Sequence, residues 1–330
     1  MNIPIPQKSQ DKLRLIHSGQ AIIKYWCQES NSFETEHLDI KLSLTDKILI
    51  ERYSVFPGIE VSYNYFFTES FSHHHAHMPT IMEVNHCRYG RIGWEMEENL
   101  NLYLGEGDFS FHMKDNCAKS FLSCPLHYYE GVSFSLDFSE LEKNIPDILK
   151  ESGINILQLL NTYGDTHTIT AIQKDYYNDY SFNGLYDLSD ELIIPYLKLK
   201  VQEFILFLSK FKFHNTSLLR PCETEQVTII KEIHSFLTTN LNTRYTIEYL
   251  SKKYLMNSST LKTTFKSVYG MPIASYMKQY RINKAMQLLR ETNKTIAEIS
   301  SEIGYESQSK FTSTFKKIIG VLPTTYRKNI

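Results

Sequence analysis

Hydrophobic and polar positions follow two different periods in the two parts of this chain. Between residues 50 and 140, hydrophobic residues alternate with others at Ile59, Val61, Tyr63 and Tyr65, and similar alternation recurs over 92–96, 100–104 and 132–138. Alternation of this kind buries one face of a strand. Turn signals separate these runs, at 57–58, 89–90, 98–99, 105–108 and 130–131. The pattern predicts an antiparallel sandwich or small barrel.

Residues 141–221 change to helical spacing. Hydrophobic residues between Leu192 and Phe211 predict one long helix, with Pro195 in its first turn. Asn215, Ser217 and Pro221 then indicate a linker. Because apolar residues occupy more than one face, the helix is interpreted either as a core helix or as a dimer contact, and the two interpretations are compatible.

Helical spacing continues from Glu223 to the end, and two segments there share one layout. One helix opens at Thr246 and another at Thr295, and the second helix of each segment opens at Ser258 or Ser307; all four are good N-cap residues. After a short turn, second helices are expected over 258–268 and 307–318, each with one apolar stripe and an outer face that is small, polar or basic. This is the pattern of a helix-turn-helix whose second helix enters a DNA major groove.

A long helix is expected between these two segments, over about residues 273–290. At ~1.5 Å per residue it spans ~27 Å. With its ends added, this helix separates the two second helices by ~34 Å, which is one turn of DNA. The sequence therefore predicts contacts with two adjacent major grooves.

Charge supports this division of the chain. Residues 222–330 carry 16 Lys and Arg against 8 Asp and Glu, whereas residues 1–221 carry 19 against 29. A basic half favours a polyanionic partner. No apolar run approaches the roughly 20 residues of a membrane helix, and the first residues do not resemble a signal peptide. Five scattered cysteines indicate reduced thiols, so we expect a cytoplasmic protein without a membrane partner.

Residues 229–328 contain a spaced set of characteristic positions, namely Leu261, Phe265, Gly270, Pro272, Arg281, Ala285, Leu288, Leu289, Ala297–Ser300, Ile303–Tyr305, Ser307, Phe311, Phe315–Lys317, Gly320, Pro323, Tyr326 and Arg327. Through these positions the segment resembles the DNA-binding domain of AraC/XylS-type transcription regulators. One difference lies in the first turn, where Leu255-Met256-Asn257 stands and the family often has a glycine; we expect Asn257 to adopt the positive φ.

The resemblance implies roles for exposed side chains of the two second helices. Gln308 suits an adenine and Lys262 suits a guanine, whereas a solvated helix face is the alternative for each lysine alone. Tyr326 and Arg327 are expected to seal the last helix. The implied base-reading residues are Ser259, Lys262, Thr263, Gln308, Ser309, Lys310 and Ser313, and the implied phosphate contacts are Lys266, Lys316 and Lys317.

The N-terminal part resembles the cupin-like sensor domains of many such regulators. The resulting fold class is α+β multidomain: a β-barrel-like sensor over 1–140, a helical dimerisation region and linker over 141–221, and a DNA-binding domain over 229–328 with helix-turn-helix units at 246–267 and 295–318. Plain core packing is the alternative for each residue proposed to line an effector pocket. These residues are Trp94, Tyr103, Phe109, Phe111, Tyr128 and Phe134.

The run from His73 to His77 partly echoes the metal motif of cupins, through His75, His77 and Glu83. Imidazoles with a carboxylate suit zinc, iron or nickel. However, Ser110 stands where the second motif needs a histidine, and His112, two residues later, faces the same side of an ideal strand. A solvated loop is the favoured interpretation, so no metal and no cofactor are predicted.

The sequence as a whole predicts an effector-responsive, homodimeric transcription regulator that binds double-stranded promoter DNA and a small molecule of unknown identity. No enzyme motif such as GxGxxG, GxxxxGK[ST], GxSxG or HExxH is present, and no catalytic base is evident. Two alternatives remain open. One is a metal-dependent cupin-type enzyme with a DNA-binding tail, and the other is a constitutive DNA-binding regulator without an effector.

Overall fold

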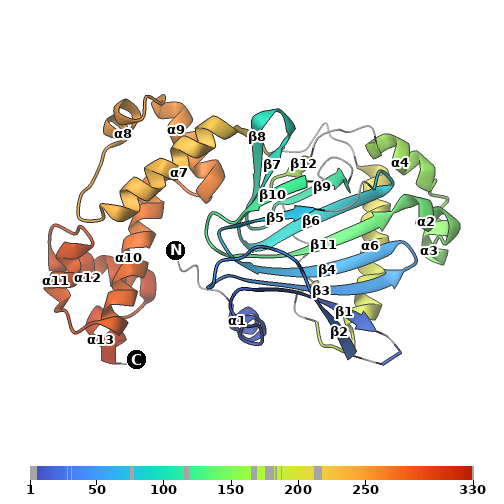
Figure 1. Ribbon diagram of the computed structural model, residues 1–330, viewed down its shortest axis with the longest axis horizontal. Coiled ribbons are helices and arrows are strands. Elements are labelled where there is room, and N and C mark those ends of the chain that lie inside the picture. The colour runs from blue at the N-terminus through green and yellow to red at the C-terminus, as the bar shows by residue number, and fades with distance from the viewer. Residues whose placement is uncertain are drawn as a thin grey trace. The chain divides into compact units, whose positions relative to one another are not determined.

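A computed structural model describes residues 6–27, 29–30, 32–74, 78–114, 119–164, 169–174, 182, 184–186, 188–211 and 218–328. The chain forms two compact units, Ile3–Pro221 and Cys222–Ile330 (Figure 1). The N-terminal unit is rich in strands and the C-terminal unit is built of helices, which confirms the predicted fold class. No helix among the described residues has the length and apolarity needed to cross a bilayer.

Two sheets organise the N-terminal unit. β1 pairs with β3 in parallel, and the other described neighbours in the larger sheet are antiparallel. The larger sheet has the order β12 (Thr170–Ile172), β9 (Phe109–Met113), β6 (Ile81–Gly90), β11 (Tyr129–Asp137), β4 (Ile59–Phe67), β3 (Lys47–Phe56), β1 (Gln20–Cys27) and β2 (Ser32–His37). Within this unit the smaller sheet has the order β8 (Leu100–Leu104), β7 (Ile92–Met96), β10 (Lys119–Ser123) and β5 (Ser70–His74).

The turn predicted at Glu130-Gly131 is wrong, because both residues lie inside β11. The register between β11 and β6 shifts at this point, as in a β-bulge. A Cβ on Gly131 would lie 2.3 Å from the carbonyl oxygen of His86, so the glycine is needed for close approach of two strands. A glycine inside a strand pattern has this meaning as often as it marks a turn.

Helices cover one face of the larger sheet. The helix predicted over Leu192–Phe211 is α6 (Ile193–Lys210), which buries Leu197, Val201 and Phe204 in the same core as Val61 and Phe134 of the sheet. The other described helices of this unit are α1 (Gln7–Arg14), the 3-10 turn η1 (Glu97–Asn99), α2 (Phe138–Lys143), α3 (Asp147–Glu151) and α4 (Ile156–Gly164).

The C-terminal unit consists of short helices arranged around a long one. After the short strand β13 (Cys222–Glu223), its elements are α7 (Thr224–Thr239), α8 (Ile247–Lys253), α9 (Ser258–Tyr269), α10 (Ile273–Glu291), α11 (Ile296–Glu302), α12 (Gln308–Ile319) and α13 (Pro323–Lys328). α10 has 19 residues, which corresponds to ~28 Å. The two helix pairs expected from the sequence are therefore α8 with α9 and α11 with α12.

Candidate nucleic-acid interface and candidate ligand cavity

Local hydrogen bonds define the first helix-turn-helix unit, α8 and α9. The Thr246 hydroxyl accepts a bond from the backbone N–H of Tyr249 at 3.1 Å, and the Asn257 side chain accepts one from the N–H of Ser259 at 2.8 Å. α9 ends at Gly270, with φ 82°. Leu261 and Phe265 are completely buried. This packing leaves Ser259, Lys262, Thr263 and Lys266 exposed on the outer face of α9.

The expectation that Asn257 adopts a positive φ is wrong. Asn257 has φ −59° and acts as the N-cap of α9, so the expectation that Ser258 is the N-cap is also wrong. Leu255 instead has φ 50°, with a side chain that is 94% exposed. Asn257 cannot serve both purposes, because an N-cap residue requires a negative φ. The residue with the left-handed backbone is therefore Leu255, two positions before Asn257, and its counterpart in the second unit is Gly304.

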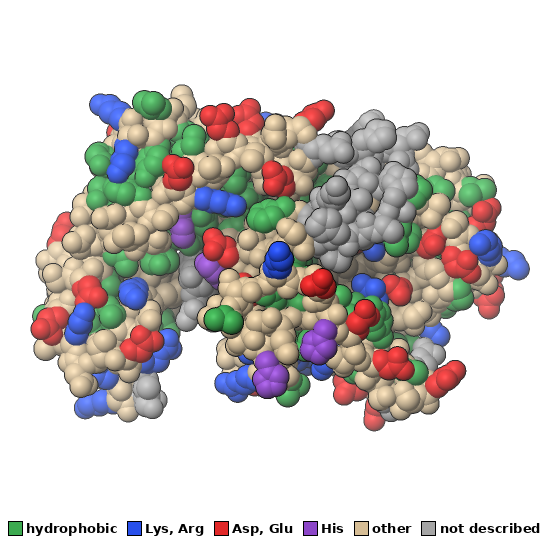
Figure 2. Space-filling view, viewed as in Figure 1, with side chains coloured by type: hydrophobic (Ala, Val, Ile, Leu, Met, Phe, Trp, Pro, Cys, Tyr) green, Lys and Arg blue, Asp and Glu red, His purple; other side chains and the backbone are tan. Residues whose placement is uncertain are grey.

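Exposed aromatic and aliphatic side chains also gather on the first unit. Figure 2 shows hydrophobic side chains at the surface over α8. The side chains of Tyr249 on α8 and of Leu255 in the following turn are 45% and 94% exposed. The rings of Tyr245 and Tyr249 stack with their centroids 5.1 Å apart, and the Lys253 ammonium lies over the ring of Phe236. The surface beside α9 is therefore aromatic as well as basic.

The second unit, α11 and α12, has the stronger cap. Thr295 and Glu298 form a reciprocal capping box, in which the Glu298 carboxylate accepts from the backbone N–H of Thr295 at 2.7 Å. Ser307 caps α12, which ends at Gly320 with φ 86°. Phe311 and Phe315 form the buried inner face of α12. The residues left exposed on α12 include Gln308, Ser309, Lys310, Ser313, Lys316 and Lys317.

Each second helix has a lysine close to a carboxylate, which the sequence analysis missed. The Lys310 ammonium donates to Glu306 at 2.5 Å, and the hydrogen bond and charge of Lys310 lower the pKa of the Glu306 carboxyl. Hydrogen bonds to its own backbone and to Thr246, and to a lesser extent the charge of Lys262, lower the pKa of Glu248. The i,i+4 spacing of 306 and 310 on a helix start was the available signal.

α10 joins the two helix pairs through packing and hydrogen bonds. Ile282, Ala285 and Leu289 pack in the same core as Phe311 and Phe315. In the last helix, Arg327 donates to the carbonyl oxygen of Lys294 at 2.7 Å, and Arg290 donates to the Tyr326 hydroxyl at 3.2 Å. These bonds fasten α13, as expected for Tyr326 and Arg327.

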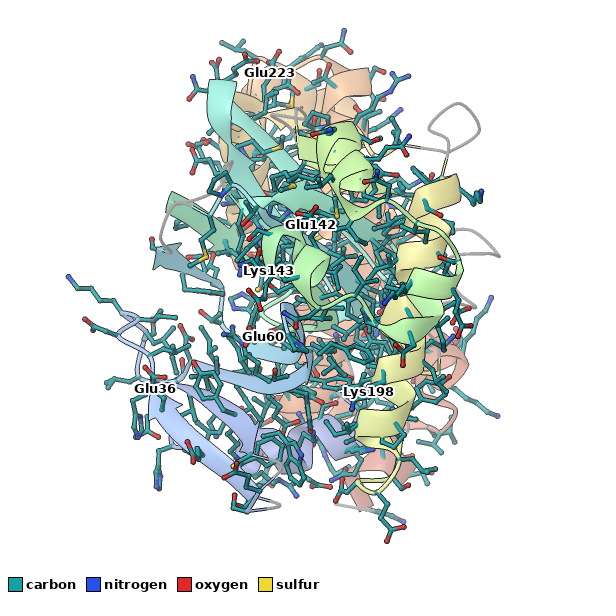
Figure 3. The ribbon with its side chains drawn as sticks, turned by 90° about the vertical axis from the view of Figure 1, so that its right-hand side faces the viewer. Glu36, Glu60, Glu142, Lys143, Lys198 and Glu223 are labelled. Atoms are coloured by element: carbon teal, nitrogen blue, oxygen red, sulfur yellow. The ribbon has the colours of Figure 1, made fainter. Side chains whose placement is uncertain are left out.

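The N-terminal unit contains a cavity of about 120 Å³ between its two sheets. The wall formed by the larger sheet carries both polar and apolar side chains, whereas the facing wall, formed by the smaller sheet, is apolar. The polar lining residues include Arg52, Glu60, Asn64, Glu83, Asn85 and Lys114, and the apolar ones include Ile50, Phe66, Phe71, Ile92, Trp94 and Tyr129. Figure 3 shows Glu60 on β4, apart from Lys198, which lies on the covering helix α6.

The polar wall is a grid formed by strand register. Across the sheet, Asn85 faces Ser133 and Ser133 faces Ser62, while in the next row Glu83 faces Ser135. Asn64 donates to the Ser133 hydroxyl at 2.7 Å, and that hydroxyl donates to the Asn85 oxygen at 2.8 Å. The wall therefore holds a chain of hydrogen bonds that crosses three strands.

Of the six residues predicted to line an effector pocket, Trp94 lines this cavity. Tyr103 is buried and packs against Gly93, where an added Cβ would lie 2.3 Å from the tyrosine ring. Phe109, Phe111, Tyr128 and Phe134 lie in the core that includes α6 residues. Alternation correctly indicates that one strand face is buried, but it does not tell which face borders a cavity. The polar residues of the opposite face were missed because alternating Ser, Asn and Glu are normally read as solvent-facing.

The metal candidates are only partly within the described residues. His75 and His77 lie outside them, and Glu83 lines the cavity and pairs with Lys114 at 3.4 Å. Ser110 and His112 lie on the same face of β9, paired across to Asn85 and Glu83. Among the residues that the structure describes, no group of three or more His, Cys, Asp or Glu side chains is arranged to hold a metal ion.

Comparisons with known proteins match the C-terminal unit. Residues 250–329 match a helix-turn-helix domain family. The chain is similar to the TetD protein of transposon Tn10 from Escherichia coli, with 35% identity over 31% of this chain and 74% of TetD. It is also 35% identical to a putative AraC-like transcription regulator from Streptomyces lividans, over 26% of this chain and 28% of that protein.

A solved structure, the C-terminal domain of the response regulator yesN from Fusobacterium nucleatum, is 31% identical over 29% of this chain and 95% of that domain, with a TM-score of 0.28. The chain spans less than a third of the length of the Streptomyces relative, whereas it covers most of TetD. The matched residues contain the capped helix pair α11 and α12 and all of α9 and α10. The chain belongs to the AraC/XylS family of DNA-binding transcription regulators.

Proposed function

We propose that this protein binds promoter DNA through α9 and α12, which enter two adjacent major grooves on one face of the duplex. The outer faces of α9 and α12 support this proposal, because each exposes short polar side chains and lysines near a capped N-terminus. Side chains at the start of a recognition helix are those that meet base edges. Ser259, Lys262, Thr263, Gln308, Ser309, Lys310 and Ser313 read bases, and Lys266, Lys316 and Lys317 contact phosphates.

Two variants of α12 test this assignment. Gln308→Ala should cost about 1–3 kcal/mol at one base pair and relax the preference there. Lys317→Ala should weaken binding to all sequences alike and reduce the salt slope by about 1. The measurement is fluorescence anisotropy with promoter DNA, single-base variants and random DNA over a salt series. Equal weakening of promoter and random DNA by both variants would overturn the base-reading assignment.

The N-terminal unit is proposed to bind a small effector in the cavity between its sheets. The protein is proposed to act in the cytoplasm as a regulator and not as an enzyme. An effector changes DNA binding only if its affinity differs between two arrangements of the protein. If promoter affinity stayed the same with every small-molecule fraction of a cell extract, the protein would be a constitutive regulator.

Dimerisation is proposed to use α6. Leu192 precedes this helix and Leu199 lies within it, and their side chains are 58% and 59% exposed while the opposite face is buried in the core. Exposed leucines one heptad apart are typical of a helix that packs on a second helix. Sedimentation of full-length protein should give a dimer, and Leu199→Glu should shift it to monomer; an unchanged dimer would place the contact elsewhere.

A further inference from the structure

The cavity in the N-terminal unit has chemistry that specifies its ligand beyond the general proposal of an effector. Its charged residues are partly exposed, with Arg52 at 29% and Glu60 at 43%, whereas its apolar residues such as Trp94 and Ile92 are buried. The charged side chains therefore form the mouth and the apolar side chains form the floor.

Among the residues that the structure describes, one polar atom at the cavity has no hydrogen-bond partner. Asn85 is 4% exposed and lines the cavity, and its side-chain nitrogen has no hydrogen-bond partner. The single hydroxyl proton of Ser133 goes to the Asn85 oxygen, because Ser133 already accepts from Asn64. The Asn85 nitrogen is thus a donor, and a buried donor without an acceptor is costly. A ligand with an acceptor oxygen satisfies it.

The charges at the mouth disfavour a ligand with a net charge. Arg52 pairs with Glu60 at 3.6 Å, and Lys114 pairs with Glu83 at 3.4 Å. These two cations and two carboxylates cancel, which favours a ligand without net charge; the lining histidine, His112 on β9, lies opposite Glu83. The Arg52–Glu60 separation exceeds an ordinary hydrogen-bond length, and Arg52 also donates through Nε to the Ser62 hydroxyl at 3.3 Å; the other guanidinium N–H groups and the Glu60 carboxylate face groups of opposite sign on a ligand.

The facing wall excludes a molecule with hydroxyls on every side. Phe71, Ile92, Trp94 and Leu122 line it, and they offer no side-chain partner for a sugar hydroxyl except the Trp94 N–H. Hydroxyls turned towards this wall would lose hydrogen bonds with water without replacement. The ligand must therefore carry its polar groups at one end and an apolar body at the other.

We propose that the cavity binds a zwitterionic amino acid with an apolar side chain, of the size of leucine. The carboxylate lies between Arg52 and the Asn85 nitrogen, the ammonium lies by Glu60, and the side chain points to the floor. A volume of about 120 Å³ holds roughly four waters at a share of ~30 Å³ each, which suits the branched side chain of leucine while its charged groups stay at the mouth. This inference rests on the proposed role of the cavity as the effector site.

Binding is tested on full-length protein by calorimetry and by tryptophan fluorescence, since Trp94 lines the cavity. The probes are L-leucine, 4-methylpentanoate without the ammonium, 3-methylbutylamine without the carboxylate, glycine without the side chain, and D-glucose. L-leucine should bind at least about tenfold more tightly than each analogue. Equal binding of either single-charge analogue, preferential binding of D-glucose, or no binding of L-leucine would overturn the proposal.

Variants locate the site. Arg52→Gln and Asn85→Leu should each weaken L-leucine at least about tenfold, whereas Glu36→Gln, on the exposed edge strand β2, should leave it unchanged. If Asn85→Leu fails to fold, Arg52→Gln and Glu60→Gln carry the test, because neither residue is fully buried. Unchanged affinity in Arg52→Gln and Glu60→Gln would overturn the site.

Promoter affinity measured with and without L-leucine distinguishes a failure of the proposed ligand class from a failure of the proposed effector role. If L-leucine binds while promoter affinity stays constant, the ligand class stands and the effector role fails. If promoter affinity responds to another molecule while L-leucine does not bind, the effector role stands and the ligand class fails.

Discussion

The two helix-turn-helix units follow one plan but solve their turns differently. In the second unit Gly304 occupies the left-handed position, and a Cβ there would lie 2.1 Å from the carbonyl oxygen of Leu241. In the first unit Leu255 occupies the left-handed position, and its side chain points into solvent. A positive φ alone is tolerated at modest cost, whereas a positive φ against a neighbouring backbone requires glycine.

The second turn is also one residue longer. One residue lies between Leu255 and Asn257, the N-cap of α9, whereas two lie between Gly304 and Ser307, the N-cap of α12. The additional residue brings Glu306 to the start of α12, where it pairs with Lys310. The first unit therefore presents Lys262 with a carboxylate from α8 nearby, and the second presents Lys310 with a carboxylate from its own turn.

The largest expected effect tests the difference between the two left-handed positions. Gly304→Ala should destabilise the C-terminal unit by about 3 kcal/mol, because the left-handed backbone and the contact with Leu241 both oppose a Cβ. Leu255→Ala should change stability by less than about 0.5 kcal/mol, since its side chain has no packing to lose.

Urea unfolding followed at 222 nm measures both variants. Trp26 and Trp94 both lie in the N-terminal unit, so tryptophan fluorescence should report an unchanged transition and serves as an internal control. Equal stability losses in the two variants would mean that the Leu241 contact has no bearing on the requirement for glycine.

A smaller effect is expected from the additional residue of the second turn. Glu306→Gln should strengthen binding to both promoter and random DNA by about two- to fivefold at low salt, because it frees Lys310 and removes a negative charge near phosphates. Anisotropy titrations over a salt series measure it. The matched control is Glu302→Gln, at the end of α11, which removes the ion pair between Glu302 and Lys294. Weaker binding by Glu306→Gln would instead indicate that the carboxylate accepts from a cytosine.

The smallest effect concerns the strain at Leu255. Leu255→Asn should stabilise the C-terminal unit by about 0.5 kcal/mol, since asparagine visits the left-handed region more readily than leucine. Leu255→Gly should be closer to neutral, because glycine loses more backbone freedom on folding. Thermal melting at 222 nm distinguishes the two. A destabilised Leu255→Asn would show that the exposed leucine makes a contact in solution.

The helical unit was predictable in detail because its signals are local. Thr246, Thr295 and Ser307 cap helices where the sequence indicated, and the apolar stripes of α9 and α12 are buried as expected. Caps and stripes depend on residues within one or two turns, so they can be read from a short window. The position of the positive φ in the first turn was predicted wrongly, because the cap and the turn compete for the same asparagine.

The sequence by itself determined the family, the division into a β-rich and a helical unit, and the exposed outer faces of α9 and α12. The tertiary structure decided which face of the larger sheet borders a cavity, and it brought Arg52, Asn85 and Trp94 to one site. These residues come from β3, β6 and β7, and their proximity depends on strand order and register. Pairing between distant strands is a property of the whole sheet and leaves no signal in a local window.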